Sequence, residues 1–229
     1  MSRHKIDDFN KNFDTEALAS TYPILLKNAG YKIGFVGKYG VGDNPPDQEF
    51  DFWACNKAGQ PPYIYKRPNG TIIHHTDSVA VGVHQFLEKF SNQGPFCLSV
   101  SFKAPHELDG SPPTYPVQER FKNLYQNVTF PQPETADPKY WQAFPDFFRT
   151  DKNIGRERWK PLLSTPELHQ QTVADYYRLI SGVDEVVGKI FNQLDSLGIA
   201  NNTIIIFTAD HGDGYAGHSW NQKQILYEE

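Results

Sequence analysis

Three short apolar runs, each preceded by a helical pattern, constrain most strongly what this chain can fold into. The runs cover residues 33–36, 96–102 and 204–207. The runs at residues 33–36 and 204–207 contain no polar side chain, which is typical of strands that are covered on both faces. The helical patterns cover residues 15–29, 77–90 and 166–197. Helices that alternate with fully buried strands predict an α/β fold, with a mostly parallel sheet and helices on both faces.

Local signals mark where the predicted elements begin and end. A glycine directly follows the first and the third helical pattern, and glycine commonly ends a helix. The middle helix begins at Thr76 or Asp77, since either side chain can cap the free amides of its first turn. Residues 64–73 predict a hairpin, because Pro68-Asn69-Gly70 within them is a turn signal.

The length of the chain suits one large domain or two small ones, and we expect residues 1–229 to form a single, incomplete α/β domain. Residues 103–165 are rich in proline and aromatic side chains and are too long for a passive connection. We expect a functional surface region or an insertion there. Its aromatic side chains could stack on sugar rings, or they could simply pack the loop against the sheet. They include Tyr115, Phe121, Tyr125, Tyr140, Trp141, Phe147 and Trp159.

Composition excludes several classes of partner. The formal net charge is −5 and no basic run stands out, which argues against nucleic acid. No apolar stretch approaches the length of a membrane span, and the first residues do not form a secretory signal. Cys55 and Cys97 are too few for a disulfide framework, and Cys97 lies in an apolar run that suits a core thiol.

Reactive side chains follow each predicted strand. Lys38 follows the first strand, His106 the second, and Asp210 with His211 the third. Lys223 lies a little further along the chain. Parallel strands bring their carboxyl ends to one edge of a sheet, where ligands bind in open α/β folds. A carboxylate can hold a metal ion at such an edge. Lysine and histidine side chains near that ion would suit a substrate with a tetrahedral oxyanion.

Each of these residues also has an ordinary structural explanation. Lys38 could be a solvated lysine, and His106 could be a loop histidine held by a backbone carbonyl. Asp210 and His211 could belong to a solvated loop after a strand. The pattern shared by three strand ends favours a site over these separate explanations.

Segments along essentially the whole chain resemble the sulfatase family of the alkaline phosphatase superfamily. Gly37-Lys38 matches the family's Gly-Lys motif, and residues 95–106 resemble the strand that ends in its Pro-His pair. Residues 203–212 resemble its second metal-binding strand. The other matching segments are residues 21–31, 49–53 and 176–184, Gly217-His218, Lys223 and residues 227–229. The resemblance implies an alkaline-phosphatase-like fold and hydrolysis of sulfate esters on a small molecule or carbohydrate.

The resemblance also implies roles for the matching residues. Lys38 would hold the nucleophile and a sulfate oxygen. His106 would contact the sulfate or protonate the leaving alcohol. Lys223 would bind a further sulfate oxygen, and His218 would be a neighbouring support at the substrate. These cationic groups would stabilise the charge that develops in the transition state.

The metal and the nucleophile are also implied by the resemblance. Asp210 would be a calcium ligand, with His211 at the position where many relatives carry Asn. The family nucleophile is a formylglycine made in a Cys/Ser-x-Pro/Ala-x-Arg motif, and neither Cys55 nor Cys97 lies in such a motif. The family's first pair of acidic metal ligands also lacks a counterpart, because Asp7-Asp8 follows no buried run.

A second departure lies in the Gly-Lys segment. The family sequence Gly-Lys-Trp-His-Leu-Gly corresponds to residues 37–42, with Gly40 in place of the usual histidine. The contact of that imidazole with the nucleophile is therefore lost, or another group replaces it. His4 or His75 could supply an imidazole only if the chain folded back.

We therefore expect the central piece of a sulfatase, truncated at both ends, with half of the site and no sulfatase activity alone. Exposed sheet edges would favour poor solubility or self-association. Two alternatives stay open: a phosphodiesterase or phosphonate hydrolase of the same superfamily, and a non-catalytic glycan-binding remnant. The family is commonly periplasmic, secreted or lysosomal, and the resemblance implies one of these locations.

Overall fold

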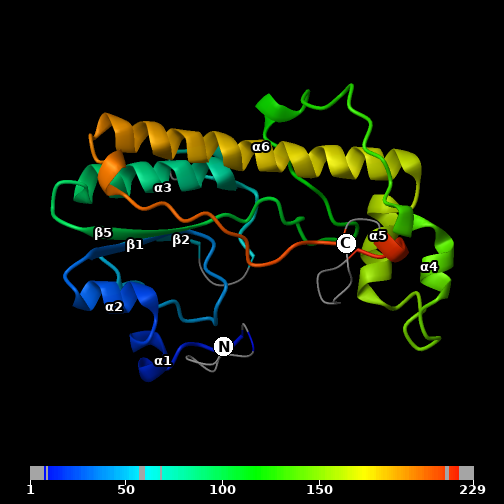
Figure 1. Cartoon of the computed structure of the whole chain (residues 1–229), viewed down its shortest axis with the longest axis horizontal. Coiled ribbons are helices and arrows are strands. Elements are labelled where there is room, and N and C mark those ends of the chain that lie inside the picture. The colour runs from blue at the N-terminus through cyan, green and yellow to red at the C-terminus, as the bar shows by residue number, and fades with distance from the viewer. Residues whose placement is uncertain (1–7, 9, 57–59, 68, 215–216, 222–229) are drawn as a thin grey trace. The chain divides into compact units, whose positions relative to one another are not determined.

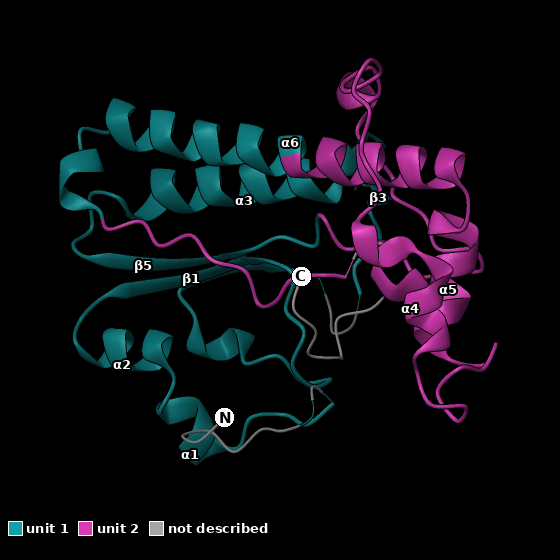
Figure 2. Cartoon of the chain, turned by 45° about the vertical axis from the view of Figure 1, so that its right-hand side comes forward, with its two compact units in different colours: residues 1–104, 181–203 teal, residues 105–180, 204–229 magenta. Residues whose placement is uncertain are grey.

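The computed structural model describes residues 8, 10–56, 60–67, 69–214 and 217–221. The chain divides into two compact units, which Figure 2 shows in different colours. The first unit comprises Met1–Ala104 and Ser181–Thr203, and the second comprises Pro105–Ile180 and Ile204–Glu229. We expected a single domain for the whole chain, and this division into two compact units does not test that prediction.

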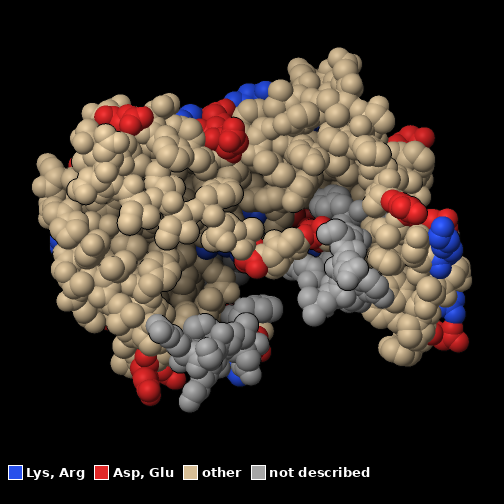
Figure 3. Space-filling view, viewed as in Figure 1, with Lys and Arg blue, Asp and Glu red and all other residues tan. Residues whose placement is uncertain are grey.

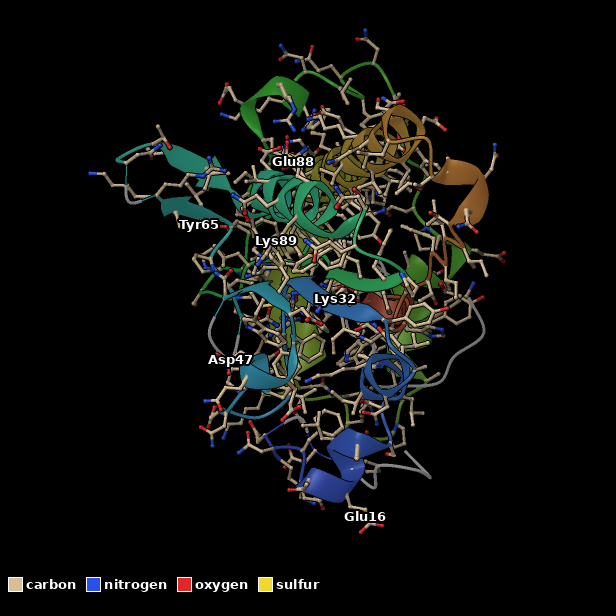
Figure 4. The ribbon with its side chains drawn as sticks, turned by 90° about the vertical axis from the view of Figure 1, so that its left-hand side faces the viewer. Glu16, Lys32, Asp47, Tyr65, Glu88 and Lys89 are labelled. Atoms are coloured by element: carbon tan, nitrogen blue, oxygen red, sulfur yellow. The ribbon has the colours of Figure 1, made fainter. Side chains whose placement is uncertain are left out.

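A parallel sheet forms the centre of the first unit. β1 (Lys32–Gly37) pairs on one side with β2 (Phe52–Cys55) and on the other with β5 (Phe96–Ser101). The first two predicted strands are confirmed as β1 and β5. The sequence analysis missed β2, although its residues Phe52–Cys55 are themselves a short apolar run. Lys32, which Figure 4 labels at the start of β1, forms an ion pair of 2.8 Å with Asp51 just before β2. This pair holds the two parallel strands in register at their first residues.

Helices cover both faces of this sheet (Figure 1). α2 (Tyr22–Asn28) packs against β1 on one face, and α3 (His75–Phe90) packs against the strands on the other. Gly34 of β1 allows this close packing, because a Cβ there would lie 2.6 Å from the Phe86 ring. The α3 face buries Val79, Val83, Phe86, Leu87 and Phe90. The predicted α/β architecture, with a parallel sheet between helices, is confirmed.

The helix predicted over residues 15–29 is two helices, α1 (Thr15–Ala19) and α2. Asp14 caps α1, and its Oδ1 accepts a hydrogen bond of 2.7 Å from the Ala17 amide. Pro23 lies in the first turn of α2. In an uninterrupted helix its ring would clash with the carbonyl of Ala19, whereas in a first turn its missing amide costs nothing. Proline therefore explains why the helix restarts.

The hairpin predicted over residues 64–73 is confirmed. β3 (Ile64–Lys66) pairs antiparallel with β4 (Ile72–His74), and Figure 4 labels Tyr65 on this hairpin. β4 runs directly into α3 without a connecting loop. The hairpin therefore decides where α3 begins.

The start of α3 differs from the sequence prediction. The N-cap is His74, and neither Thr76 nor Asp77 takes that position. The His74 Nδ1 accepts a hydrogen bond of 3.2 Å from the Thr76 amide. The His75 amide donates to the Tyr63 carbonyl oxygen at 2.7 Å, so a backbone contact with the hairpin satisfies another free donor of the first turn.

α6 (Pro166–Ser196) confirms the long helix predicted over residues 166–197. Its residues from Ser181 onward belong to the first unit, where they lie alongside α3 (Figure 1). Leu194 joins the apolar core of that unit, and the Gln193 Nε2 donates to the His84 carbonyl oxygen at 3.3 Å. The far half of α6 thus covers the outer side of α3.

The long segment at residues 103–165 contains short helices, and most of its aromatic side chains are packed. Trp141 is buried, and the Arg156 guanidinium lies 4.7 Å from its ring centroid and 3.9 Å from that of Trp159. Phe147 differs, since it is 83% exposed. The helices are α4 (Pro138–Gln142) and α5 (Ile154–Leu163). Short 3₁₀ turns of the chain lie at Asp47–Glu49, Glu119–Phe121, Glu134–Ala136, Ala200–Asn202 and Gly217–Ser219.

The buried strand predicted over residues 204–207 is wrong. The structure assigns no strand there, and Ile204, Ile206 and Phe207 are 90%, 84% and 75% exposed. A strand requires a hydrogen-bonding neighbour for its backbone groups, and an apolar run does not supply one. Among the described residues, β2 and β5 are the edges of the sheet and neither pairs with this segment. The predicted self-association through exposed apolar segments and sheet edges stays a prediction.

The surface gives two further observations. No helix within the described ranges is long and apolar enough to cross a membrane. On the face in Figure 3, the Lys and Arg side chains of the described residues form no continuous patch, in keeping with a net charge of −5.

Candidate functional site

Lys38 directly follows β1, where the chain leaves the sheet. Gly37 before it has a φ of 105°, a conformation that favours glycine. A Cβ on Gly37 would lie 2.0 Å from the Ser101 carbonyl oxygen, so only glycine allows this approach to the end of β5. The Lys38 amide donates to the same carbonyl oxygen at 2.8 Å. These contacts fix the position from which the half-buried Lys38 side chain extends.

Buried polar residues lie with Lys38 in the first unit. The charges of His74, Lys103 and Lys38 all act on the His75 imidazole. We call Lys38, His74, His75, Thr76 and Lys103 the strand-end cluster. It gathers residues that follow β1 and β5, the last residue of β4 and the first two residues of α3.

Lys103 is the most deeply buried cation of this cluster. Its side chain is 2% exposed, and its Nζ donates to the Pro61 carbonyl oxygen at 2.5 Å. The same Nζ lies 4.9 Å from the Tyr63 ring centroid, close enough for a cation–π contact. The Tyr63 ring also packs on His74, with 5.1 Å between centroids. The hairpin and the segment before it therefore hold Lys103 in place.

His75 is neutral at physiological pH. Its side chain is fully buried, and its pKa is lowered from 6.5 to about 4. Burial is the largest cause, because removal from water penalises the imidazolium, and the charges of His74, Lys103 and Lys38 lower the pKa further. Within the described part of the chain, neither ring nitrogen has a hydrogen-bond partner, and the Thr76 hydroxyl also has none.

Neither cysteine is an activated nucleophile. Burial raises the pKa of the Cys55 thiol to about 12 and also raises the pKa of Cys97. Burial and the charge of Cys55 raise the pKa of Tyr39 to about 12. Because the thiolate is the reactive form of cysteine, both thiols are unreactive near neutral pH.

His106 lies in the second unit and is held by the residue that follows it. Its Nδ1 lies 2.7 Å from the Glu107 carbonyl oxygen and 3.8 Å from the Glu107 Oε2. The buried Glu107 carboxylate forms an ion pair with Arg158, which also reaches Asp109 at 2.9 Å. Burial acts to lower the pKa of Arg158, but the two carboxylates outweigh it and raise that pKa. His106 therefore sits on a charged, hydrogen-bonded support.

Asp210 and His211 contact each other. The His211 Nε2 lies 3.3 Å from the Asp210 Oδ2, and the His211 Nδ1 lies 2.7 Å from the Gly212 carbonyl oxygen. The Asp210 side chain is 86% exposed. The pair is thus a local turn at the surface of its unit.

This pair by itself does not fit calcium. Calcium usually takes six to eight oxygen ligands, and the pair offers one carboxylate and one imidazole. Among the residues that the structure describes, no group of three or more His, Cys, Asp or Glu side chains could hold a metal ion. Calcium binding at Asp210 and His211 stays a prediction.

His218 belongs to a turn packed on α4 and α5 of the second unit. Its ring meets Tyr140 and Phe144 edge-on, with centroids 5.5 and 5.8 Å away. After it, the Trp220 Nε1 donates to the Asn153 Oδ1 at 2.9 Å. Lys223, predicted as a sulfate-binding residue, lies outside the described residues, as does His4.

The structure thus brings together a set that the sequence patterns did not group. Lys38 and Lys103 belong to the first unit and act electrostatically on His75, whereas His106, Asp210, His211 and His218 each belong to the second. Lys103 directly follows a predicted strand, so its position at a strand end was visible in the sequence. No sequence signal places His75 within electrostatic range of Lys38, because that proximity depends on the course of the hairpin.

Comparison with known proteins identifies the family. The sulfatase family model matches residues 19–229. Iduronate 2-sulfatase of Homo sapiens is 32% identical over 255 residues, which cover 93% of this chain and 44% of that protein. The N-acetylglucosamine-6-O-sulfatase of Bacteroides thetaiotaomicron is 24% identical over 272 residues, which cover 91% and 47%. The chain therefore spans less than half the length of these two relatives.

Solved structures share the fold. The structure of BT4656 in complex with its substrate D-glucosamine-2-N,6-O-disulfate has a TM-score of 0.69 and 24% identity, covering 97% of this chain and 55% of that one. The phosphonate monoester hydrolase of Silicibacter pomeroyi has a TM-score of 0.70 and 18% identity, covering 98% and 53%. Together with the family match, these likenesses show that the chain belongs to the sulfatase family and has its alkaline-phosphatase-like fold.

Proposed function

We propose that this chain carries part of the site of a hydrolase that cleaves sulfate esters of a carbohydrate. The observation that carries the proposal is the strand-end cluster, in which Lys38 and Lys103 surround a neutral His75 at the carboxyl ends of parallel strands. A lysine ammonium offers three donors and a full charge, which suits a sulfate whose oxygens gain charge as the ester bond breaks. Carbohydrate as the substrate class is supported by the relatives named above, which are sulfatases of sugars.

His106 is proposed to protonate the leaving alcohol. A carbonyl oxygen only accepts hydrogen bonds, so the His106 Nδ1 carries the proton in its contact with Glu107, and Nε2 is the nitrogen proposed to act on the substrate. The nearby Glu107 carboxylate offsets the charge of an imidazolium that donates through Nε2. Arg158 forms an ion pair with that carboxylate and holds it in place.

The other predicted roles rest on family resemblance. Lys223 is proposed as a second sulfate-binding residue, His218 as a neighbouring support, and Asp210 with His211 as a calcium position. Because the described donors do not form a calcium site, no step of the proposal passes through a metal. The formylglycine motif does not occur in the sequence, so these residues bind and protonate but supply no nucleophile.

Calorimetric titration of the chain tests this function. N-acetylglucosamine 6-sulfate is expected to bind saturably, and unsulfated N-acetylglucosamine is not. Lys38→Met is expected to weaken binding by roughly tenfold or more, since it removes a charged hydrogen bond to the sulfate. Lys89→Met is the matched control, because Lys89 (labelled in Figure 4) carries the same charge in the last turn of α3, at the opposite end of the helix from His75.

Two results would contradict the proposal. Equal affinity for the sulfated and the unsulfated sugar would show that sulfate is not recognised. Tighter binding of N-acetylglucosamine 6-phosphate than of the sulfate would favour the phosphonate or phosphodiester hydrolase alternative.

A further inference from the structure

His75 has buried hydrogen-bonding groups that the described chain does not use. Its side chain is 0% exposed, and both ring nitrogens lack a partner among the described residues. The neighbouring Thr76, also 0% exposed, has an unpartnered hydroxyl in the same part of the structure. Buried polar groups are nearly always hydrogen-bonded, so three unsatisfied atoms on adjacent residues indicate a partner other than the described residues.

The surroundings of these atoms favour an anion. His75 and Thr76 are the first residues of α3, a helix of 16 residues, and a helix N-terminus attracts negative charge through its free amides and its dipole. The charges that lower the pKa of His75 come from Lys38, Lys103 and His74, all of them basic groups. Asp77 is the acidic residue in the first turn of α3 and is half-buried.

We propose that the strand-end cluster is an oxyanion site in which the His75 imidazole and the Thr76 hydroxyl donate hydrogen bonds to a sulfate group, beside the ammonium groups of Lys38 and Lys103. The proposal rests on the sulfate-ester function proposed above and adds two ligand residues to it. A neutral imidazole carries one N–H donor and one acceptor, so His75 can donate to an oxyanion without adding a third buried charge.

Lys38 marks the side from which an anion can enter. It is the half-buried member of the cluster, whereas His74, His75, Thr76 and Lys103 are buried. The sulfate would thus lie between the Lys38 ammonium and the more deeply buried donors of the cluster.

The position of Gly40 agrees with this arrangement. Gly40 follows Lys38 by two residues and has no side chain to offer a hydrogen bond. The resemblance described above implies a histidine there. The structure instead places the His75 imidazole, at the start of α3, within electrostatic range of Lys38, so the cluster keeps one imidazole near the Gly-Lys lysine.

Nuclear magnetic resonance of the whole chain with sodium sulfate tests the proposal. Long-range ¹H–¹⁵N spectra report the two ring nitrogens of each histidine, and His75→Phe identifies the His75 signals. Sulfate is expected to shift the His75 ring signals saturably and to raise the pKa of His75, because an anion stabilises the imidazolium. Sodium chloride at matched ionic strength is expected to do neither.

Variants separate a ligand role from a structural one. His75→Phe keeps a buried ring of similar size, and Thr76→Val keeps the shape of the side chain. Each is expected to keep the fold and to weaken sulfate binding by roughly tenfold, the effect of a lost hydrogen bond to a charged group. His84→Phe is the control, since His84 lies on the same helix with 57% of its side chain exposed and is expected to leave sulfate binding unchanged.

The outcomes distinguish this inference from the proposed function. Sulfate binding that Lys38→Met abolishes but His75→Phe and Thr76→Val leave unchanged would overturn the role of His75 and Thr76 and leave the function standing. Absence of saturable sulfate binding to the unmodified chain would overturn both. Should His75→Phe fail to fold, Thr76→Val still decides, because unchanged sulfate binding in that variant would overturn the inference.

Discussion

The amide of Lys38 donates a hydrogen bond of 2.8 Å to the carbonyl oxygen of Ser101, and this contact ties the end of β1 to the end of β5. It exists because Gly37 turns the chain with a positive φ directly over that carbonyl. The position of the candidate sulfate-binding lysine therefore depends on a glycine next to it.

Gly37→Ala is expected to destabilise the fold by about 3 kcal/mol, from a strained backbone and a clash with the Ser101 carbonyl oxygen. Gly30→Ala is the control, because Gly30 has a φ of 92° with no atom within 4 Å of an added Cβ. It is expected to cost only about 1–2 kcal/mol. Urea unfolding measures both, and equal losses would show that the clash is absent.

The buried His75 is expected to make stability depend on pH in a defined window. Its pKa is about 4 in the fold and 6.5 in the unfolded chain, so between these values the unfolded state binds a proton that the folded state does not. Stability is therefore full above pH 6.5 and falls as pH decreases toward 4, by roughly 3 kcal/mol. Burial of the imidazole is the main cause of this shift in pKa, and the charges of His74, Lys103 and Lys38 add to it.

Urea unfolding of the unmodified chain and of His75→Phe from pH 7 to pH 4 measures this contribution. Between pH 6.5 and pH 4, the free energy of unfolding of the unmodified chain is expected to fall relative to that of His75→Phe. A constant difference would show that His75 is protonated in the fold as easily as in the unfolded chain.

Arg158→Met is expected to destabilise the second unit by roughly 3 kcal/mol, because it leaves the buried carboxylate of Glu107 without its ion pair. The double variant Glu107→Gln with Arg158→Met removes both charges and is expected to recover most of that loss. Thermal unfolding of the unmodified chain, the single variant and the double variant measures these changes in stability. If the double variant were as unstable as the single one, the packing of Arg158 and not its charge would be the cause.

Gly155→Ala is expected to displace the turn that carries His218. An added Cβ would lie 1.9 Å from the Trp220 Nε1, the atom that donates to Asn153. Tryptophan fluorescence is expected to shift to longer wavelength as the Trp220 ring becomes exposed. Gly188→Ala in α6 is the control, since an added Cβ there would meet no atom within 4 Å. This substitution is expected to raise the free energy of unfolding by about 1 kcal/mol.

The 229 residues alone are expected to show no turnover of an aryl sulfate, with or without calcium, because their sequence contains no formylglycine motif and both thiols are protonated. A colorimetric assay with 4-nitrophenyl sulfate checks this. Robust turnover, retained after Lys38→Met, would require a different nucleophile and a different site.

Sequence patterns alone determined the α/β class, the strands at β1 and β5, the hairpin and the long helix α6. They also placed Lys38 and Lys103 at strand ends. These features depend on the spacing of apolar residues and on turn residues, which act over a few neighbouring positions. The resemblance to sulfatases followed from short motifs in order along the chain.

Only the tertiary structure decided which distant residues meet. The apolar run at residues 204–207 has the composition of a buried strand, yet it is exposed because a strand exists only with a partner. His75 has no local signal of function, yet the hairpin and α3 bring it to Lys38. Pairing and burial are contacts between residues far apart in the chain, and no local spacing encodes them.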